Sequence, residues 1–450
     1  MENSLAGAMP PAVPKSDSTM KDVSKMNRRL DEALTAAGLL ALQVFVVIVA
    51  GLADFHYTPH LGAMEYGFFR DVSLMIFFGF GFLMTFLHSY GLSAIGYCLV
   101  ISAVVVECSM AVEYLVMDRT SEVSIETLLN GLFCAGAVMI SYGAVLGKVT
   151  PFQLLSMAAL EVVAFWLNFK WSVTDNVAHD VGGGMVIHTF GAYFGLSVSW
   201  WVSQRSAFGH KAEASIYSSD LFSLAGTIIL WVLWPSFQSA VAGTEEKQML
   251  AAANTFLSLC SSTLAFAIVS RFLNGGSRFN VVHLQNATLA GGVVMGVAGD
   301  LDMGLPLTMS MGFVAGALSC VGYAVIQPLL EKLLIHDTCG VNNLHGMPGV
   351  LGSVLSIILV ASKPEAWAGE GVTATTQLSA LLITLGVALA AGNLTGLLIS
   401  MPLRRCGVFV PAVEYFSDAS FFEMAPMTPA EAGKEALTPS RDATDARALA

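Results

Sequence analysis

Long apolar stretches of about 20 residues recur along this chain, and they limit its fold more than any other feature. A helix of about 20 residues spans the hydrocarbon core of a bilayer, which is roughly 30 Å thick. Because lipid offers the backbone no hydrogen bonds, such stretches must be helical. The sequence therefore predicts an all-α, polytopic membrane protein with about 12 transmembrane helices. The stretches begin near residues 35, 71, 92, 125, 151, 181, 218, 250, 281, 306, 343 and 377.

The composition supports this fold class and excludes others. Hydrophobic residues make up 55% of the 450 residues and charged residues only 12%, which lies well outside the range of soluble domains. The net charge is −12 and no basic patch is present, so no nucleic-acid partner is expected. The seven cysteines show no paired extracellular framework, which argues against structural disulfides.

Lysine and arginine collect in alternate loops, which predicts the orientation of the chain. The loops on the side of the N-terminal tail hold most of them: Lys148, Arg205, Lys211, Arg271, Arg278, Lys332, Arg404 and Arg405. The opposite loops hold Arg70, Arg119, Lys170, Lys247 and Lys363. Positively charged loops favour the cytoplasmic side. We therefore expect a multi-pass protein of the plasma membrane with both termini in the cytoplasm.

The polar ends of the chain mark the domain boundaries. Residues 1–34 contain three prolines and several basic residues without an apolar run, and they predict a cytoplasmic tail. Residues 35–424 form the expected membrane domain, and residues 425–450 form an expected disordered, cytoplasmic C-terminal tail. Within the domain we expect an extra N-terminal helix, a first repeat at about 71–204, a second at about 218–362 and a final helix at about 377–402.

The two repeats carry one matching motif. DVGGGMVIH, Asp180 to His188, and DTCGVNNLH, Asp337 to His345, both have Asp first, Gly three residues later and His eight residues later. The first motif opens the sixth apolar stretch and the second opens the eleventh. Stretches two to six and seven to eleven are thus two sets of five, and an odd number of crossings gives the two sets inverted topology.

Helix geometry predicts where these histidines lie. An Asp at a helix start caps free amide groups and suits the positive end of the helix dipole. Eight residues carry each His about 12 Å inward, so from opposite faces the two imidazoles should lie within roughly 6 Å of each other in depth. Depth does not reveal whether they meet laterally. Two neutral imidazoles can pair as donor and acceptor; the alternative is two separate packing histidines bonded to backbone carbonyls.

Several motifs resemble the ammonium transporter family, most closely its Rhesus-type branch. They are GFGFLMTFL (79–87), YGAVLGKV (142–149, with Tyr142 where Phe is usual), IHTFGAYFGL (187–196), HLQNATLAGG (283–292) and DTCGVNNLHGMPG (337–349). The resemblance covers about 35–424. It implies eleven core helices in two inverted repeats of five plus one, an extra first helix in the Rhesus branch, and a homotrimer with a pore in each subunit.

The resemblance also implies roles for individual residues. His188 and His345 match the twin histidines of the substrate pore, and Asp180 and Asp337 match the acids at the two helix starts. Phe133 and Phe237 match two stacked phenylalanines that close the outer pore. Asp220 and Glu331 resemble Rhesus-type acids near the pore entrances, as candidate vestibule acids. Some positions depart from the family: Asn168 replaces an outer Trp, and Phe169, Val241 and Asn280 replace polar or acidic residues.

The implied function is a transmembrane channel or transporter that conducts ammonia, derived from ammonium, through an apolar pore. Moving an ion into such a pore costs several kcal/mol or more, so the neutral molecule is favoured. A gas channel that also passes carbon dioxide and a transporter-like ammonium sensor remain alternatives. An intramembrane zinc enzyme would need three protein ligands, and each Asp lies about 12 Å from its His along the helix. We therefore expect no enzyme, no metal and no cofactor, and as partners only ammonium or ammonia, the bilayer and further copies of the chain.

Overall fold

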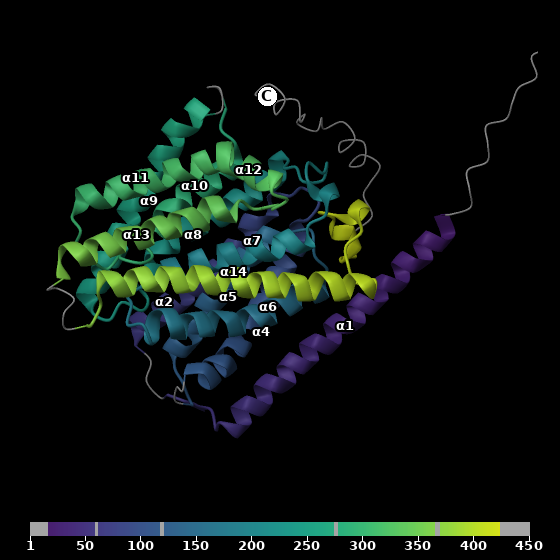
Figure 1. Ribbon diagram of the computed structural model, residues 1–450, viewed down its shortest axis with the longest axis horizontal. Helices are drawn as coiled ribbons and strands as arrows, with labels where there is room; N and C mark the ends of the chain where they lie inside the picture. Colours follow the sequence, from purple (N-terminus) through teal and green to yellow (C-terminus); the bar gives the residue numbers. More distant parts are fainter. Residues whose placement is uncertain (1–16, 59–61, 118–120, 274–277, 365–369, 424–450) are drawn as a thin grey trace, which may run out of the picture.

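The computed structural model describes residues 17–58, 62–117, 121–273, 278–364 and 370–423, and this part of the chain is a bundle of helices (Figure 1). Twelve helical rods follow one another within it, as the sequence predicted. Ten of them are long and apolar enough to cross a membrane, and the other two are η4 with α7, and α10.

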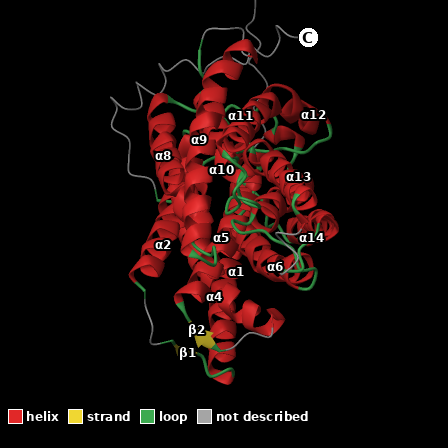
Figure 2. Cartoon of the chain, turned by 90° about the vertical axis from the view of Figure 1, so that its left-hand side faces the viewer, coloured by secondary structure: helices red, strands yellow, loops and turns green. Residues whose placement is uncertain are grey.

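The first six rods lie before residue 203. They are α1 (Asp17–Leu52); α2 (Ala63–Leu74) continued by η1 (Met75–Phe80), α3 (Gly81–Leu83) and η2 (Met84–Phe86); α4 (Gly91–Met117); α5 (Ile125–Val145); α6 (Pro151–Phe169) with η3 (Lys170–Thr174); and η4 (Gly184–Thr189) with α7 (Phe190–Val202). Between them, β1 (His56–Tyr57) pairs in parallel with β2 (Glu122–Val123) beside the end of α1 (Figure 2).

The other six rods follow. They are α8 (Tyr217–Ser239); α9 (Glu245–Leu273); α10 (Val281–Val294); α11 (Leu305–Val321) continued by η6 (Gly322–Ile326) and α12 (Gln327–Lys332); η7 (Asn342–Gly346) with α13 (Met347–Ser362); and α14 (Ala374–Arg405). In Figure 1 α11, α13 and α14 run roughly along the longest axis of the molecule. The elements η1, η3, η4, η6 and η7 are π-helical.

Two helices begin earlier than the sequence predicted. Residues 17–34, assigned to a tail, are helical as the start of α1. The second rod begins at Ala63 instead of near residue 71. Both segments lack proline, and the first also lacks glycine. Without these helix-breaking residues, the helix of the following apolar stretch extends toward the N-terminus through each segment. Residues 1–16 and the expected tail 425–450 lie outside the described residues.

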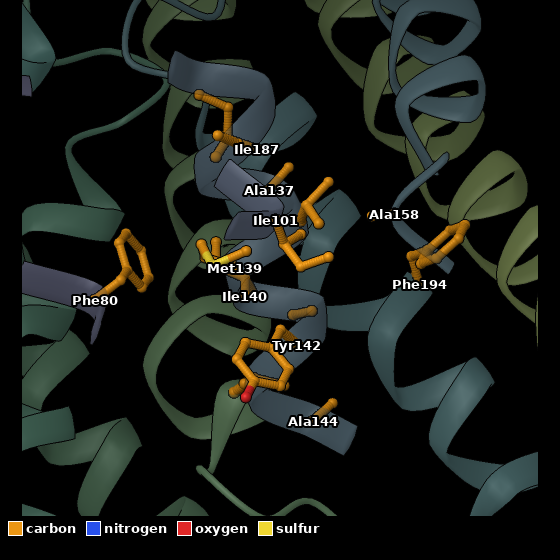
Figure 3. Close-up of a cluster of buried hydrophobic side chains, with 14 of the residues drawn as sticks. Phe80, Ile101, Ala137, Met139, Ile140, Tyr142, Ala144, Ala158, Ile187 and Phe194 are labelled. Carbon is orange, nitrogen blue, oxygen red and sulfur yellow. The ribbon is translucent and has the colours of Figure 1, made fainter. Parts of the chain in front are cut away.

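The core of the bundle surrounds α5. In its most apolar window 89% of residues are buried, against 0% for α1, which lies obliquely against α4 and α6 at the edge of the bundle (Figure 1). Figure 3 shows Ala137, Met139, Ile140 and Tyr142 of α5 among the buried side chains of this core. Close packing there uses small residues: a methyl group on Gly191 would lie 2.7 Å from the carbonyl oxygen of Ala137.

The segment after α14 folds back over the ends of α4 and α5. The Asp418 carboxylate accepts hydrogen bonds from the backbone N–H groups of Leu92 (3.0 Å) and Ser93 (2.6 Å) at the start of α4. The N–H of Phe416 donates to the carbonyl oxygen of Gly147 (3.0 Å), just beyond α5. Tyr415 and Phe416 are buried. This segment therefore holds the chain end against the bundle on the face that also carries Asp337.

Candidate functional site

His188 and His345 meet inside the bundle. Their Nδ1 atoms lie 3.1 Å apart, their rings are nearly parallel with centroids 5.2 Å apart, and the two residues are 2% and 3% exposed. A hydrogen bond between two Nδ1 atoms requires one ring to donate and the other to accept. The lateral meeting that helix geometry left open thus occurs, and the reading of two separate packing histidines is wrong.

Each histidine is delivered by a short π-helical turn that its motif Asp caps. The Asp180 carboxylate accepts from the N–H groups of Met185 (3.0 Å) and Val186 (2.9 Å). The Asp337 carboxylate accepts from those of Val341 and Asn342, both at 2.9 Å. Both acids therefore bond the first amide groups of the helices that carry His188 and His345, in the structural role expected of them.

The backbone conformation explains the glycine that both motifs share at the third position after Asp. Gly183 and Gly340, each three residues after its Asp, adopt φ values of 69° and 72°. An L-residue with a side chain is disfavoured there. This left-handed turn lets the carboxylate of the preceding Asp reach the amide groups at the helix start. The repeat of Asp, Gly and His thus encodes a complete helix-start structure.

Two aromatic rings that the sequence reasoning missed lie next to the histidine pair. The Trp234 ring lies parallel to His188 at 5.6 Å between centroids, and Phe80 lies parallel to His345 at 6.2 Å. Trp234 precedes Phe237 by three residues on α8, so the two share one helix face, and this spacing could have identified it. Phe80 lies within GFGFLMTFL, where several phenylalanines compete for the same role.

Phe133 and Phe237 form an aromatic contact above His188. Their centroids are 4.8 Å apart at an interplanar angle of 73°, so the rings meet edge to face and are not stacked as expected. Edge-to-face contact lets the positive ring edge meet the negative ring face. The Phe237 ring also lies 6.0 Å from that of His188. Phe237 therefore contacts both His188 and Phe133, and Phe133 lines the space described next.

That space is a cavity of about 290 Å³, which we call the vestibule. The vestibule is open to the surface, and Asp180 is among the residues that line it. Its wall combines aromatic, charged and amide side chains: Glu126, Asn130, Phe133, Trp166, Phe169 and Lys247. Trp166 keeps an indole ring in this wall although Asn168 stands at the aligned Trp position, and Val241 also lines it. Asn168 itself is fully buried.

A smaller cavity lies on the other side of the histidine pair. It measures about 20 Å³, and we call it the His345 cavity. His345, Phe80, Leu83, Met139, Ile140 and Leu344 are among its lining residues. The histidine pair thus stands between a wide, partly charged vestibule and a narrow, mainly apolar cavity.

Three other predicted positions lie away from these two cavities. Asp220 is half-buried in the first turn of α8, and Glu331 is exposed in α12; neither lines the vestibule or the His345 cavity. Asn280 is the N-cap of α10, where its side chain accepts from the N–H of His283 (3.1 Å). Within the described residues, no three His, Cys, Asp or Glu side chains are grouped as a metal site would require.

Comparison with known proteins places this arrangement in context. The model of the Ammonium Transporter Family matches residues 38–405. Rhesus-like glycoprotein B of Dictyostelium discoideum is 41% identical over 80% of this chain, and the match spans 64% of that protein, less than two thirds of its length. Ammonium transporter Rh type C of Homo sapiens is 38% identical over 86% of this chain and 88% of that protein.

Solved structures agree with the sequence relatives. The structure of Rh50 of Nitrosomonas europaea has a TM-score of 0.73 and 32% identity, covering 83% of this chain and 95% of that chain. A sensor Amt protein has a TM-score of 0.59 with 17% identity over 84% of this chain and 97% of that chain, which establishes a shared fold alone.

Proposed function

Since the chain belongs to the ammonium transporter family, we propose that it is a membrane channel or transporter, and not an enzyme, that conducts ammonia derived from ammonium. The path runs from the vestibule past Phe133 and Phe237, along His188 and His345, into the His345 cavity. The observation that carries this proposal is the Nδ1–Nδ1 hydrogen bond of two buried histidines between two cavities.

The hydrogen bond between the rings fixes what the pair offers a passing molecule. The ring that donates from Nδ1 has a bare Nε2, which accepts; the ring that accepts at Nδ1 carries its proton on Nε2, which donates. Nε2 of His188 has no partner among the described residues. Ammonia both donates and accepts hydrogen bonds, so it can bond to either Nε2 as it passes, without any charge on the pair.

The surroundings favour the neutral molecule over the cation. Around the pair the rings of Trp234, Phe237 and Phe80 supply no carboxylate and no carbonyl oxygen. A cation that leaves water there regains only part of its hydration energy from the aromatic rings, and the remaining cost is several kcal/mol. The vestibule, by contrast, holds the carboxylates of Glu126, Asp180 and Asp300, which attract ammonium. Ammonium therefore transfers its proton to solvent water in the open vestibule before it reaches the pair, and ammonia passes.

The orientation, the location and the assembly belong to the same proposal. The basic loops support a cytoplasmic Asp337 face and both termini in the cytoplasm of a plasma-membrane protein. The exposed apolar side chains of α8 and α9, such as Phe222, Ile228, Leu264 and Ile268, suit lipid or a neighbouring subunit, and the family resemblance supports a homotrimer. No observation on this chain favours carbon dioxide passage or a sensor role over ammonia transport.

Proteoliposomes test this function. After an ammonium gradient is applied, entering ammonia raises the internal pH, which a trapped dye reports. We expect a faster rise than in empty liposomes, and about five- to tenfold slower entry for His188→Leu and His345→Leu, which keep the side-chain bulk but remove hydrogen bonds worth about 1 kcal/mol each. His56→Ala, on an exposed residue, serves as the control. Equal rates for the parent and empty liposomes would refute the proposal.

A further inference from the structure

The repeated motif begins one residue before its Asp. His179 precedes Asp180 and His336 precedes Asp337, so both segments begin with His-Asp and reach the pore histidine nine residues after the first His. Neither of these leading histidines lies in the histidine pair. Both nevertheless make side-chain contacts with a charged residue from the other half of the chain, at opposite ends of the pore.

His179 is held at the vestibule. Its Nε2 lies 2.8 Å from Oδ1 of Asp300, a buried residue in the connection between α10 and α11. The Gln377 side chain of α14 clamps its backbone, because Oε1 accepts from the N–H of His179 (2.8 Å) and Nε2 donates to its carbonyl oxygen (2.9 Å). Three residues later the N–H of Gly182 donates to the carbonyl oxygen of Gly296 (2.6 Å).

His336 is held at the other end of the pore. Its Nδ1 lies 3.0 Å from Nζ of Lys148, which also donates to the His336 carbonyl oxygen (2.7 Å). Its Nε2 lies 3.0 and 3.1 Å from the two carboxylate oxygens of Glu213. A protonated Lys148 has only protons to give, so below its pKa Nδ1 accepts and Nε2–H donates to Glu213. Burial, then the charge of Lys148, lower the pKa of His336 to about 2, so this ring stays neutral.

The two arrangements correspond to each other. Lys148 follows Gly147 just past the end of α5, and Asp300 follows Gly299 just past the end of α10. Lys148 comes from the first half of the chain and holds the motif of the second half; Asp300 comes from the second half and holds the motif of the first. Each half thus provides the contact that fixes the start of the other half's pore helix.

We propose that His179–Asp300 and Lys148–His336–Glu213 are two matched latches, which position His188 and His345 for transport by fixing the Asp that starts each pore helix. The inference rests on the proposed function. His179 and His336 are positioning residues, because they act on the pore through Asp180 and Asp337. An Nδ1–Nδ1 separation of 3.1 Å is close to the upper limit for a hydrogen bond, so a helix start displaced by about 1 Å would break it.

The hydrogen bonds of His179 and His336 determine which substitutions test the latches. Neutral His336 accepts at one side-chain end and donates at the other, and glutamine offers the same pair of groups. Glutamine at position 179 likewise keeps an N–H donor for Asp300. His179→Gln and His336→Gln therefore keep the latches, whereas His179→Ala, His336→Ala and Asp300→Ala open them. His56→Ala is the matched control, because His56 is exposed and its ring contacts the backbone oxygen of Asp54, away from both pore helices.

The first readout is transport by folded protein in liposomes, with thermal stability measured on the same samples. We expect ammonia entry to fall about tenfold in each alanine variant, as is common when a residue that orients a functional side chain is lost. The glutamine variants and the control should retain the parent rate. The double variant His179→Ala/Asp300→Ala should be no slower than either single variant, because both remove one contact. Parent rates in the alanine variants, or additive losses, would overturn the proposal.

The second readout does not depend on transport. In protein with ¹⁵N-labelled histidine, the scalar coupling across the Nδ1–Nδ1 hydrogen bond reports the His188–His345 contact directly. We expect the coupling in the parent and in His179→Gln, and its loss in His179→Ala. Persistence of the coupling in His179→Ala and His336→Ala would overturn the latch proposal. If the parent itself fails to conduct ammonia, the proposed function fails while this measurement still decides the positioning role.

Discussion

At the scale of single residues, buried polar side chains have fewer protons than acceptor atoms, which determines the direction of each hydrogen bond. The histidine pair has one hydrogen bond between its rings, and a second such case lies nearby in the core. The Ser141 Oγ is 2.5 Å from Glu161 Oε1 and 2.8 Å from the carbonyl oxygen of Gly191. A hydroxyl donates one proton and a carbonyl only accepts, so Ser141 donates to Gly191 and Glu161 donates to Ser141.

This arrangement predicts that Glu161 carries a proton in the folded protein. Glu161→Gln keeps a donor to Ser141 and should change the free energy of unfolding by less than about 1 kcal/mol. Glu161→Ala removes a fully buried side chain and should cost about 2–3 kcal/mol through the cavity and the lost bond. Unfolding of the purified protein measures both. Equal destabilisation by the two substitutions would contradict a protonated Glu161 that donates to Ser141.

At the scale of elements, the helix starts decide where the histidines lie. The sequence predicted the capping role of Asp180 and Asp337, because capping is local chemistry. It did not predict that the helix carrying His188 begins four residues after Asp180, at Gly184, because a left-handed turn at Gly183 intervenes. It also missed Lys148 and His336, because their contact joins segments far apart in the chain. Phe80 was missed because its motif holds several phenylalanines, whereas Trp234 could have been identified from its spacing to Phe237.

The left-handed glycines give a prediction at this scale. Gly183→Ala and Gly340→Ala should each cost roughly 1–2 kcal/mol from backbone strain. A methyl group would also crowd Ile187 in the first case and Tyr323 in the second, so ammonia entry should fall as well. Gly371→Ala is the matched control: its φ is 72°, but a methyl group there would lie 3.4 Å from Val177 alone. Transport losses as small as those of Gly371→Ala would show that these turns do not position the pore.

The segment after α14 gives another prediction. Asp418 satisfies two amide groups at the start of α4, and loss of such a cap costs about 1–2 kcal/mol. Asp418→Ala should therefore lower the thermal stability and make residues 407–423 more sensitive to limited proteolysis. Asp418→Asn, which keeps one acceptor oxygen, should have an intermediate effect. Unchanged protection of the segment in Asp418→Ala would contradict its role in docking the chain end.

At the scale of the whole molecule, the latch at the Asp337 end links stability to pH. Burial raises the pKa of Glu213 from an ordinary 4.5 to about 7. Between these values the folded protein holds a proton that the unfolded chain has released, so the free energy of unfolding falls as pH rises. Glu213→Gln removes this group, and its stability should depend less on pH from 4.5 to 7. Burial lowers the pKa of Lys148 from 10.5 to about 7. The contribution of Lys148 to the pH dependence of stability therefore lies above pH 7, outside that window. Identical slopes for parent and variant would refute the assignment.

The whole molecule also shows which level of structure a sequence determines. The twelve rods follow from apolar length, which is a property of continuous segments. The edge-to-face contact of Phe133 and Phe237 does not, because it depends on how α5 and α8 pack. The early start of α1 at Asp17 was missed because a polar composition was interpreted as a tail, although helices tolerate polar residues at their ends.

The most direct test of the central claim is the internal pH of proteoliposomes after an ammonium gradient is applied, compared between the parent and His188→Leu at equal protein content. The account predicts a faster rise in the parent than in empty liposomes and a rate about five- to tenfold lower in the variant. A parent rate equal to that of empty liposomes would contradict ammonia conduction through the histidine pore, and an unchanged rate in His188→Leu would contradict the role of the pair.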